Sequence, residues 1–183
     1  MERPFYKADS MRVATAINNT RLLDPAYLEA TLKKHIAGGA GSVFNDISSV
    51  EQMEQSLKAA NWKQAEHAGV PKGMVAFVTT DIPGGLFGMV RIEDLSDETV
   101  LTAIAPKRSN RVSLTVSDVQ RKTVAQTWVI LAVDPESGEE FMMTFHPGEP
   151  IDPGLVMGDK LVEGQVITKA RALKLGYEWA NIV

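Results

Sequence analysis

His146 is the side chain in this sequence best placed to do chemistry. It follows the apolar run Phe141–Phe145 and stands two residues after Thr144, so in an extended strand both side chains point to the same face. An imidazole near neutral pH can take a proton from a ribose 2′-hydroxyl or give one to a leaving oxygen. We therefore assign His146 and Thr144 as candidate catalytic residues of a metal-independent ribonuclease.

Cations gather between residues 107 and 122, where five Lys or Arg residues accompany a single acid. Arg111 is the third candidate catalytic residue, because a guanidinium stabilises the charge that develops on a phosphorane. Lys107 and Arg108 are candidate substrate-binding residues that would hold phosphate, and the Ser113 hydroxyl would orient it. The alternative interpretation is that these side chains form a solvated strand end.

His146 also has a purely structural interpretation. A histidine before Pro-Gly closes a strand when its ring hydrogen-bonds a nearby carbonyl, and Thr144 has high strand propensity in its own right. No metal site is predicted, because the three histidines are scattered at 35, 67 and 146 and the chain has no cysteine. No cofactor is predicted either.

The element that positions His146 is a hairpin of two apolar strands. Trp128–Val133 and Phe141–Phe145 are rich in β-branched and aromatic residues, and Asp134–Gly138 between them carries the residues that turns require. Both strands are apolar at alternating and non-alternating positions. The pattern predicts a hairpin in the middle of a sheet whose two faces are covered.

The stretch 127–148, TWVILAVDPESGEEFMMTFHPG, resembles the late hairpin of the barnase-EndoU-colicin-RelE type ribonuclease toxins. In that group an acidic turn with Gly is followed by a strand that ends in Thr and then Pro. The resemblance implies cleavage of RNA without a cofactor. The chain departs from the group in its acidic charge, in the 35 residues that follow Gly148, and in having no second histidine in the sheet region.

Two helices are predicted before the sheet. Asp24 caps a helix that starts at Pro25. Ser49 and Gln52 form a capping box for a second helix that runs toward Glu66, and His67 would meet the dipole at its end. The two helices form an antiparallel pair.

Further strands are predicted after the helices. Gly73–Thr80 and Leu86–Ile92 read as a first hairpin, followed by strands over Val100–Ile104 and Val112–Ser117. Thr168 caps a short helix over 169–175. The segment 177–183 reads as an edge strand.

These elements predict an α+β fold: an N-terminal helical pair followed by a mostly antiparallel sheet or partly closed barrel, with a short C-terminal helix. We expect one domain over residues 1–183, with a helical subregion at 1–68 and a β-rich subregion at 70–183. Oligomeric state is left open.

Composition limits the functional classes. The sequence contains no apolar run that would span a membrane and no cysteine, and its N-terminus does not resemble a secretory signal. These features predict a soluble, cytoplasmic protein. A net charge of −4 and a pI near 5.4 argue against a general nucleic-acid binder. Two classes remain. The first is a ribonuclease-like domain of bacterial or phage/mobile-element type that acts on RNA. The second is a non-enzymatic module or inhibitor that covers a protein partner, and the acidic charge of this chain favours a basic partner.

Overall fold

The computed structural model describes residues 6–105 and 110–183. The chain has an α+β fold, as the sequence predicts. It divides into two compact units, each built from two separate stretches of chain. Unit 1 comprises Met1–Leu86 with Thr123–Pro150, and unit 2 comprises Phe87–Lys122 with Ile151–Val183. His146 therefore belongs to a unit that also contains the three N-terminal helices.

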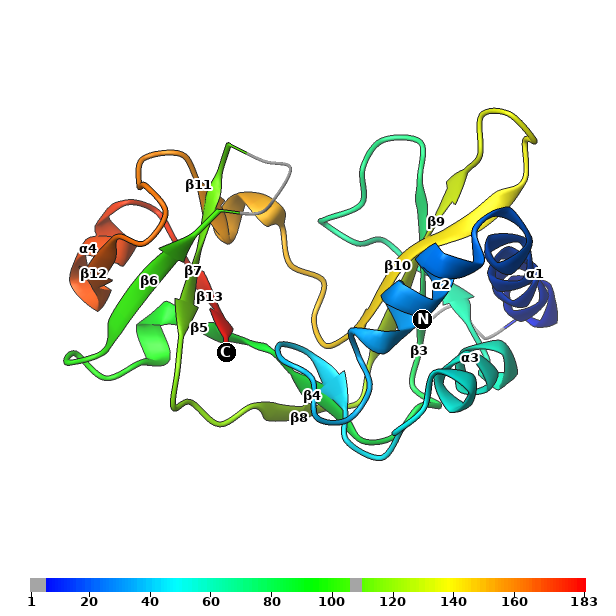
Figure 1. The fold of residues 1–183 in the computed structure, drawn as a ribbon, viewed down its shortest axis with the longest axis horizontal. Coiled ribbons are helices and arrows are strands. Elements are labelled where there is room, and N and C mark those ends of the chain that lie inside the picture. Colours follow the sequence, from blue (N-terminus) through cyan, green and yellow to red (C-terminus); the bar gives the residue numbers. More distant parts are fainter. Residues whose placement is uncertain (1–5, 106–109) are drawn as a thin grey trace. The chain divides into compact units, whose positions relative to one another are not determined.

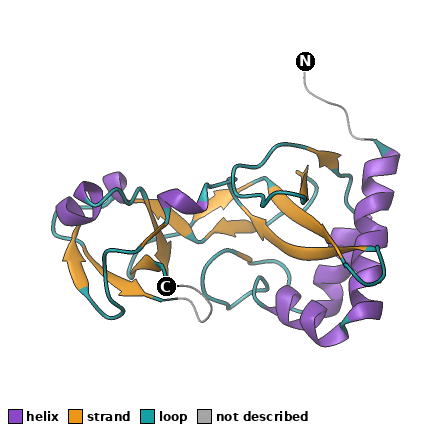
Figure 2. Cartoon of the chain, turned by 90° about the horizontal axis from the view of Figure 1, so that it is seen from above, coloured by secondary structure: helices purple, strands orange, loops and turns teal. Residues whose placement is uncertain are grey.

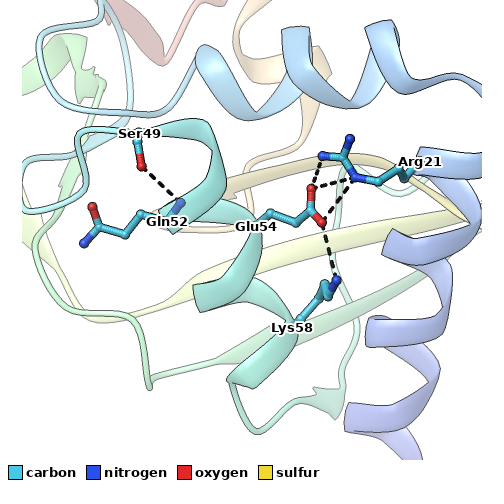
Figure 3. Close-up of polar contacts among 5 residues, drawn as sticks. All are labelled: Arg21, Ser49, Gln52, Glu54 and Lys58. Carbon is cyan, nitrogen blue, oxygen red and sulfur yellow. Dashed lines mark hydrogen bonds and ion pairs between the residues drawn. The ribbon is translucent and has the colours of Figure 1, made fainter.

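The helices of unit 1 are α1 (Lys7–Leu23), α2 (Pro25–Lys33) and α3 (Val50–Ala59). Both predicted caps are confirmed: Asp24 Oδ1 accepts the N–H of Tyr27 at 3.0 Å, and Ser49 Oγ accepts the N–H of Gln52 at 3.1 Å (Figure 3). The longest helix, α1, carries no clear apolar period in the sequence. Its buried residues include the small side chain of Ala16 beside Val13 and Ile17, so a narrow stripe is sufficient for packing.

The prediction that the second helix continues toward Glu66 is wrong. Helix α3 ends at Ala59, and backbone N–H groups that follow it bond to side chains elsewhere. The N–H of Asn61 bonds to Asp81 Oδ2 at 2.7 Å, that of Trp62 to Ser10 Oγ at 2.9 Å and that of Gln64 to Asp9 Oδ2 at 3.1 Å. Lys63–Gln64 then forms the short strand β2. His67 consequently lies in a loop, and the predicted contact with a helix dipole does not exist.

The main sheet of unit 1 has four antiparallel strands in the order β10-β9-β3-β2, with β3 at Val75–Thr79, β9 at Thr127–Val133 and β10 at Glu140–Pro147. The predicted β9–β10 hairpin is confirmed, and Gly138 in its turn has a φ of 73°, which favours glycine. Of the two hairpin strands, only β9 lies inside this sheet, between β10 and β3. Strand β10 is at its edge, contrary to the prediction that the whole hairpin is central.

The predicted first hairpin is also wrong. Strand β3 pairs with β9 and β2, whereas the following segment forms β4 (Gly85–Phe87) and β5 (Met89–Arg91). Strand β4 lies between β1 (Val43–Phe44) and β8 (Lys122–Val124) in a small three-stranded sheet.

The two faces of the four-stranded sheet are covered differently. The three helices pack on one face, as Figures 1 and 2 show for α1 to α3 beside the long hairpin, and form the main core there with Phe77, Val129, Met142 and Phe145. The second face carries a smaller cluster of Ala76, Val78, Trp128 and Ile130, with Ala65, Val70, Met74 and Met143 packed against it. The cover of this second face therefore includes the loop between β2 and β3.

Polar side chains tie the helices of unit 1 to one another and to the hairpin. The buried carboxylate of Glu54 on α3 pairs with Arg21 on α1 and lies 3.4 Å from Lys58 Nζ (Figure 3). Its hydrogen bond with Arg21 lowers the pKa of Glu54. Arg12 on α1 holds Glu140 on β10 through two contacts of 2.7 Å, the bidentate geometry that makes such pairs strong.

Unit 2 contains a sheet in the order β12-β6-β7-β13-β5, with β11 also paired to β7. Strands β6 (Val100–Ile104) and β7 (Val112–Val116) confirm the prediction, as does Thr168, whose hydroxyl caps helix α4 (Lys169–Lys174). The C-terminal strand β13 (Trp179–Ile182) lies between β7 and β5, so the prediction of an edge strand is wrong. The remaining strands are β11 (Met157–Gly158) and β12 (Val166–Thr168), and the 3-10 turns are η1 (Ile92–Asp94) and η2 (Pro153–Leu155).

None of the sheets closes into a barrel within the described residues. Across those same residues, no helix combines the length and the apolar character that crossing a bilayer requires.

Candidate functional site

His146 and Thr144 share the second face of the unit 1 sheet. In the register of the hairpin, Thr144 pairs with Ile130 and His146 pairs with Trp128, and both partners belong to the second-face cluster. An irregularity between Met142 and Thr144 shifts the register, but the last four residues of the strand, from Thr144 to Pro147, pair regularly with β9 and alternate between the two faces. The structure therefore brings the two predicted residues onto one face, with both side chains half-buried.

A second histidine reaches the same place from the β2–β3 loop. His67 Nε2 lies 3.2 Å from His146 Nε2, and the His67 ring meets the indole of Trp128 edge-to-face, with 5.0 Å between the ring centroids. The sequence interpretation, which had no second histidine in the sheet region, missed this contact. No periodic signal marks it, because a loop that folds back over the sheet delivers His67.

The hydrogen bonds around the two rings define where the protons are. His67 Nδ1 accepts the backbone N–H of Gly69 at 2.9 Å, so the neutral His67 ring carries its proton on Nε2. His146 Nδ1 faces the carbonyl of Pro147 at 3.1 Å and donates to it, so His146 Nε2 is free to accept from His67. The bond to Pro147 matches the strand-closing interpretation of His146.

Burial keeps both rings neutral. It lowers the pKa of His146 to about 4, with smaller contributions from the charges of His67 and His35, while the Pro147 carbonyl acts in the opposite direction. Burial also lowers the pKa of His67. At neutral pH all four ring nitrogens are thus engaged, so His146 can act as a general base only if its contact with His67 opens.

The other predicted residues lie in unit 2 or outside the described residues. Arg111 precedes β7 and donates from Nη2 to the carbonyl of Met157. Ser113 on β7 pairs with Ile104 and Met157. Lys107 and Arg108 lie outside the described residues, so their role in binding stays a prediction.

The pair of histidines is a poor metal site as it stands. To bind a metal ion through Nε2, His67 would need that nitrogen to be unprotonated. Its Nδ1 already has to be unprotonated, because it accepts the N–H of Gly69, and a neutral imidazole has only one unprotonated nitrogen. In the part of the chain that the structure describes, no three His, Asp or Glu side chains are grouped so that they could hold a metal ion.

A separate groove of about 380 Å³ lies in unit 1 where the junction of α1 and α2 meets the β9–β10 turn. We call it the acidic groove. It combines carboxylates with partly exposed apolar side chains, and none of its lining residues is Lys or Arg. The lining residues are Thr20, Leu23, Asp24, Tyr27, Asp134, Glu136 and Phe141.

Local structure holds the groove open and charged. Tyr27, 39% exposed, is fixed by a hydrogen bond from its hydroxyl to the carbonyl of Met143. Asp134 accepts the N–H of Ser137 at 2.8 Å, and this bond is the main reason that the pKa of Asp134 is lowered. Leu23 is 45% exposed beside them. The sequence interpretation noted the acids of 134–140 only as turn residues, because the chain alone does not show that α1 and α2 face this turn.

Comparisons with protein-family models, curated proteins and solved structures found no match to this chain. The resemblance of the 127–148 hairpin to ribonuclease toxins accordingly stays a prediction.

Proposed function

We propose that the chain is a protein-binding module that engages a basic, partly apolar segment of a partner through the acidic groove of unit 1. The observation that carries the proposal is the composition of this groove. Three carboxylates surround an exposed tyrosine and leucine without any cation in the lining. Tyrosine supplies a large contact area at low conformational cost and is enriched among residues that dominate binding energy.

The charges favour a cationic occupant. Asp24, Asp134 and Glu136 stand on two separate elements around one groove, so an incoming Lys or Arg side chain meets negative charge from both sides. The net charge of −4 adds long-range attraction for a basic partner. Binding should therefore weaken as ionic strength rises.

The groove can be tested by selecting peptides from a randomised display library on the purified wild type. We expect enrichment of Lys and Arg next to aromatic or aliphatic residues. Glu136 is exposed, and no hydrogen bond or ion pair of its side chain is found among the described residues, so Glu136→Lys reverses a charge without removing a structural contact. A selected peptide should bind this variant roughly tenfold or more weakly.

Glu163→Lys is the matched control, since Glu163 is an exposed acid of unit 2. It makes the same change in net charge and should leave peptide affinity within about twofold of wild type, a small effect typical of a distant charge in salt. Selection of uncharged or acidic peptides, or equal weakening by both variants, would contradict the assignment of the groove.

The second candidate function is a ribonuclease-like domain. The observation in its favour is that a second imidazole, His67, lies beside His146 and Thr144 on one sheet face, because metal-independent RNA cleavage uses one base and one acid. Against it, both rings are neutral and bonded to each other.

Cleavage of RNA in the presence of EDTA separates the two candidates. The binding proposal predicts that wild type, His146→Ala and His67→Ala all leave RNA intact. If the wild type cleaves and either substitution lowers the rate by about 10²-fold or more without changing the melting temperature, the enzyme interpretation replaces the binding one.

A further inference from the structure

The loop between β2 and β3 covers the second face of the unit 1 sheet with few polar attachments. Its residues Ala65, Val70 and Met74 pack on the cluster that contains Trp128 and Ile130. An open depression of about 500 Å³ on the surface is lined by this loop and by the start of β3.

The backbone bonds of the loop are mostly internal. The N–H of Val70 bonds to the carbonyl of His67 and that of Met74 to the carbonyl of Pro71, both at 3.1 Å, and Ala65 is held by Ala76 at the edge of β3. Among the described residues, the contact between His67 and His146 is the one hydrogen bond that joins the interior of the loop, residues 66–73, to β9 or β10. This contact therefore carries the polar attachment of the loop to the hairpin.

The hydrogen-bonded chain around the two rings accepts no extra proton. It runs from the N–H of Gly69 to His67 Nδ1, from His67 Nε2–H to His146 Nε2, and from His146 Nδ1–H to the carbonyl of Pro147. A proton added to His67 Nδ1 would face the Gly69 N–H, and one added to His146 Nε2 would face the His67 N–H. Protonation at either nitrogen would therefore point two N–H donors at each other, and the hydrogen bond between them would be lost.

No neighbouring carboxylate compensates for such a proton. The titratable side chains whose charges act on His146 are His67 from the loop and His35 from the segment after α2, and both oppose protonation. The strands β3 and β9 present only apolar residues to the cluster on this face. Glu66 and Lys72 of the loop are exposed to solvent.

We propose that the contact between His67 and His146 is an acid-sensitive latch, which fixes residues 65–74 over the second sheet face at neutral pH and releases them when either ring gains a proton. Release would uncover the apolar cluster around Trp128 and Ile130. This device belongs to the fold of unit 1 and is independent of the acidic groove.

Amide hydrogen exchange of the wild type at pH 7 and pH 5, corrected for the intrinsic rate at each pH, tests the latch. Between pH 7 and pH 5, protection of residues 65–74 should fall roughly twentyfold, the factor that follows when the pKa of His146 returns from about 4 in the closed loop to 6.5 in the open one. Protection in α1, on the other face, should stay constant.

Two variants make the test specific. In His146→Gln the amide oxygen can still accept from His67 but cannot titrate, so most of the pH dependence should be lost while protection at pH 7 is kept. His35→Gln removes the third histidine and should keep the full drop. A loop whose protection does not change with pH in the wild type, or falls equally in wild type and His146→Gln, would overturn the proposal.

A measurement on the wild type alone covers the case in which His146→Gln does not fold. Nitrogen-15 NMR of the imidazoles at pH 7 should find the proton of His67 on Nε2 and that of His146 on Nδ1. Two rings that both carry their protons on Nε2 would overturn the latch, because neither could then accept from the other.

Discussion

Lowering the pH from 7 to 4 is expected to reduce the free energy of unfolding of the wild type by about 2 to 3 kcal/mol more than that of His146→Gln. The effect comes from His146, whose pKa is about 4 in the folded chain and 6.5 when exposed. Between these values the unfolded chain binds a proton that the folded chain does not. Stability is therefore complete above pH 6.5 and is lost as the pH falls toward 4.

Other groups do not mimic this difference. The pKa values of Glu54 and Glu140 are lowered by their arginine partners, so these acids stabilise the fold above their unfolded pKa and lose that contribution as the pH falls through their folded pKa. Both proteins share that loss, and the comparison between them removes it. The value of about 2 to 3 kcal/mol is an upper limit. If the loop 65–74 opens before the whole chain unfolds, the two histidines gain protons in the folded chain, and less of the effect remains in the free energy of unfolding.

Urea unfolding of both proteins at pH 7, 6, 5 and 4 measures the difference directly. The two curves of unfolding free energy against pH should coincide in shape above pH 6.5 and diverge below it. Parallel curves down to pH 4 would show that His146 titrates as an exposed histidine, which contradicts the burial of the pair.

Phe145→Ala is expected to cost unit 1 about 3 to 5 kcal/mol, because truncating a buried phenylalanine loses apolar burial and leaves a cavity. Phe145 is completely buried on the helix-covered face of β10. Its ring lies nearly parallel to that of Phe44, with centroids 6.4 Å apart, and His35 meets it edge-on at 4.7 Å. The substitution thus removes the contacts of β10 with both Phe44 and His35.

Val133→Ala is the control for this truncation. Val133 ends the neighbouring strand β9 and is 51% exposed, so its loss should cost less than about 1 kcal/mol. Urea unfolding at pH 7 measures both variants. A cost below 1 kcal/mol for Phe145→Ala would mean that β10 does not turn this residue into the core.

Local signals predicted local structure well. Asp24, Ser49 and Thr168 cap the helices that follow them, because a cap depends only on a side chain and an N–H two or three residues away. The turn at 134–138 follows the same logic, with Pro, Asp and Gly in one short stretch. The sequence also placed His146 and Thr144 on one face, since the alternation of a strand is local.

Contacts between segments far apart in the chain could not be predicted from the sequence. After α3 ends, the backbone of Trp62 and Gln64 is held by Ser10 and Asp9, more than fifty residues earlier in the chain. The pairing of β3 with β9 crosses a similar span. His67 meets His146 across 79 residues. Such pairings follow from how whole elements pack, and neither propensity nor period in one sequence specifies them.

The acidic groove was missed for the same reason. Tyr27 and Leu23 have no unusual signature in the sequence, and the acids at 134–140 were interpreted only as turn residues. These residues form a groove only because α1 and α2 pack on β10, which brings Leu23 and Tyr27 beside the turn.

The most direct test of the binding proposal is a hydrogen-exchange footprint of the peptide enriched by display selection, measured on the full chain at pH 7. The proposal predicts new protection at residues 20–27 and 134–141, which include the lining of the acidic groove, with unit 2 unchanged and a weaker footprint on Glu136→Lys at the same peptide concentration. Protection confined to unit 2 or to the loop 65–74 would contradict the assignment of the groove as the binding site.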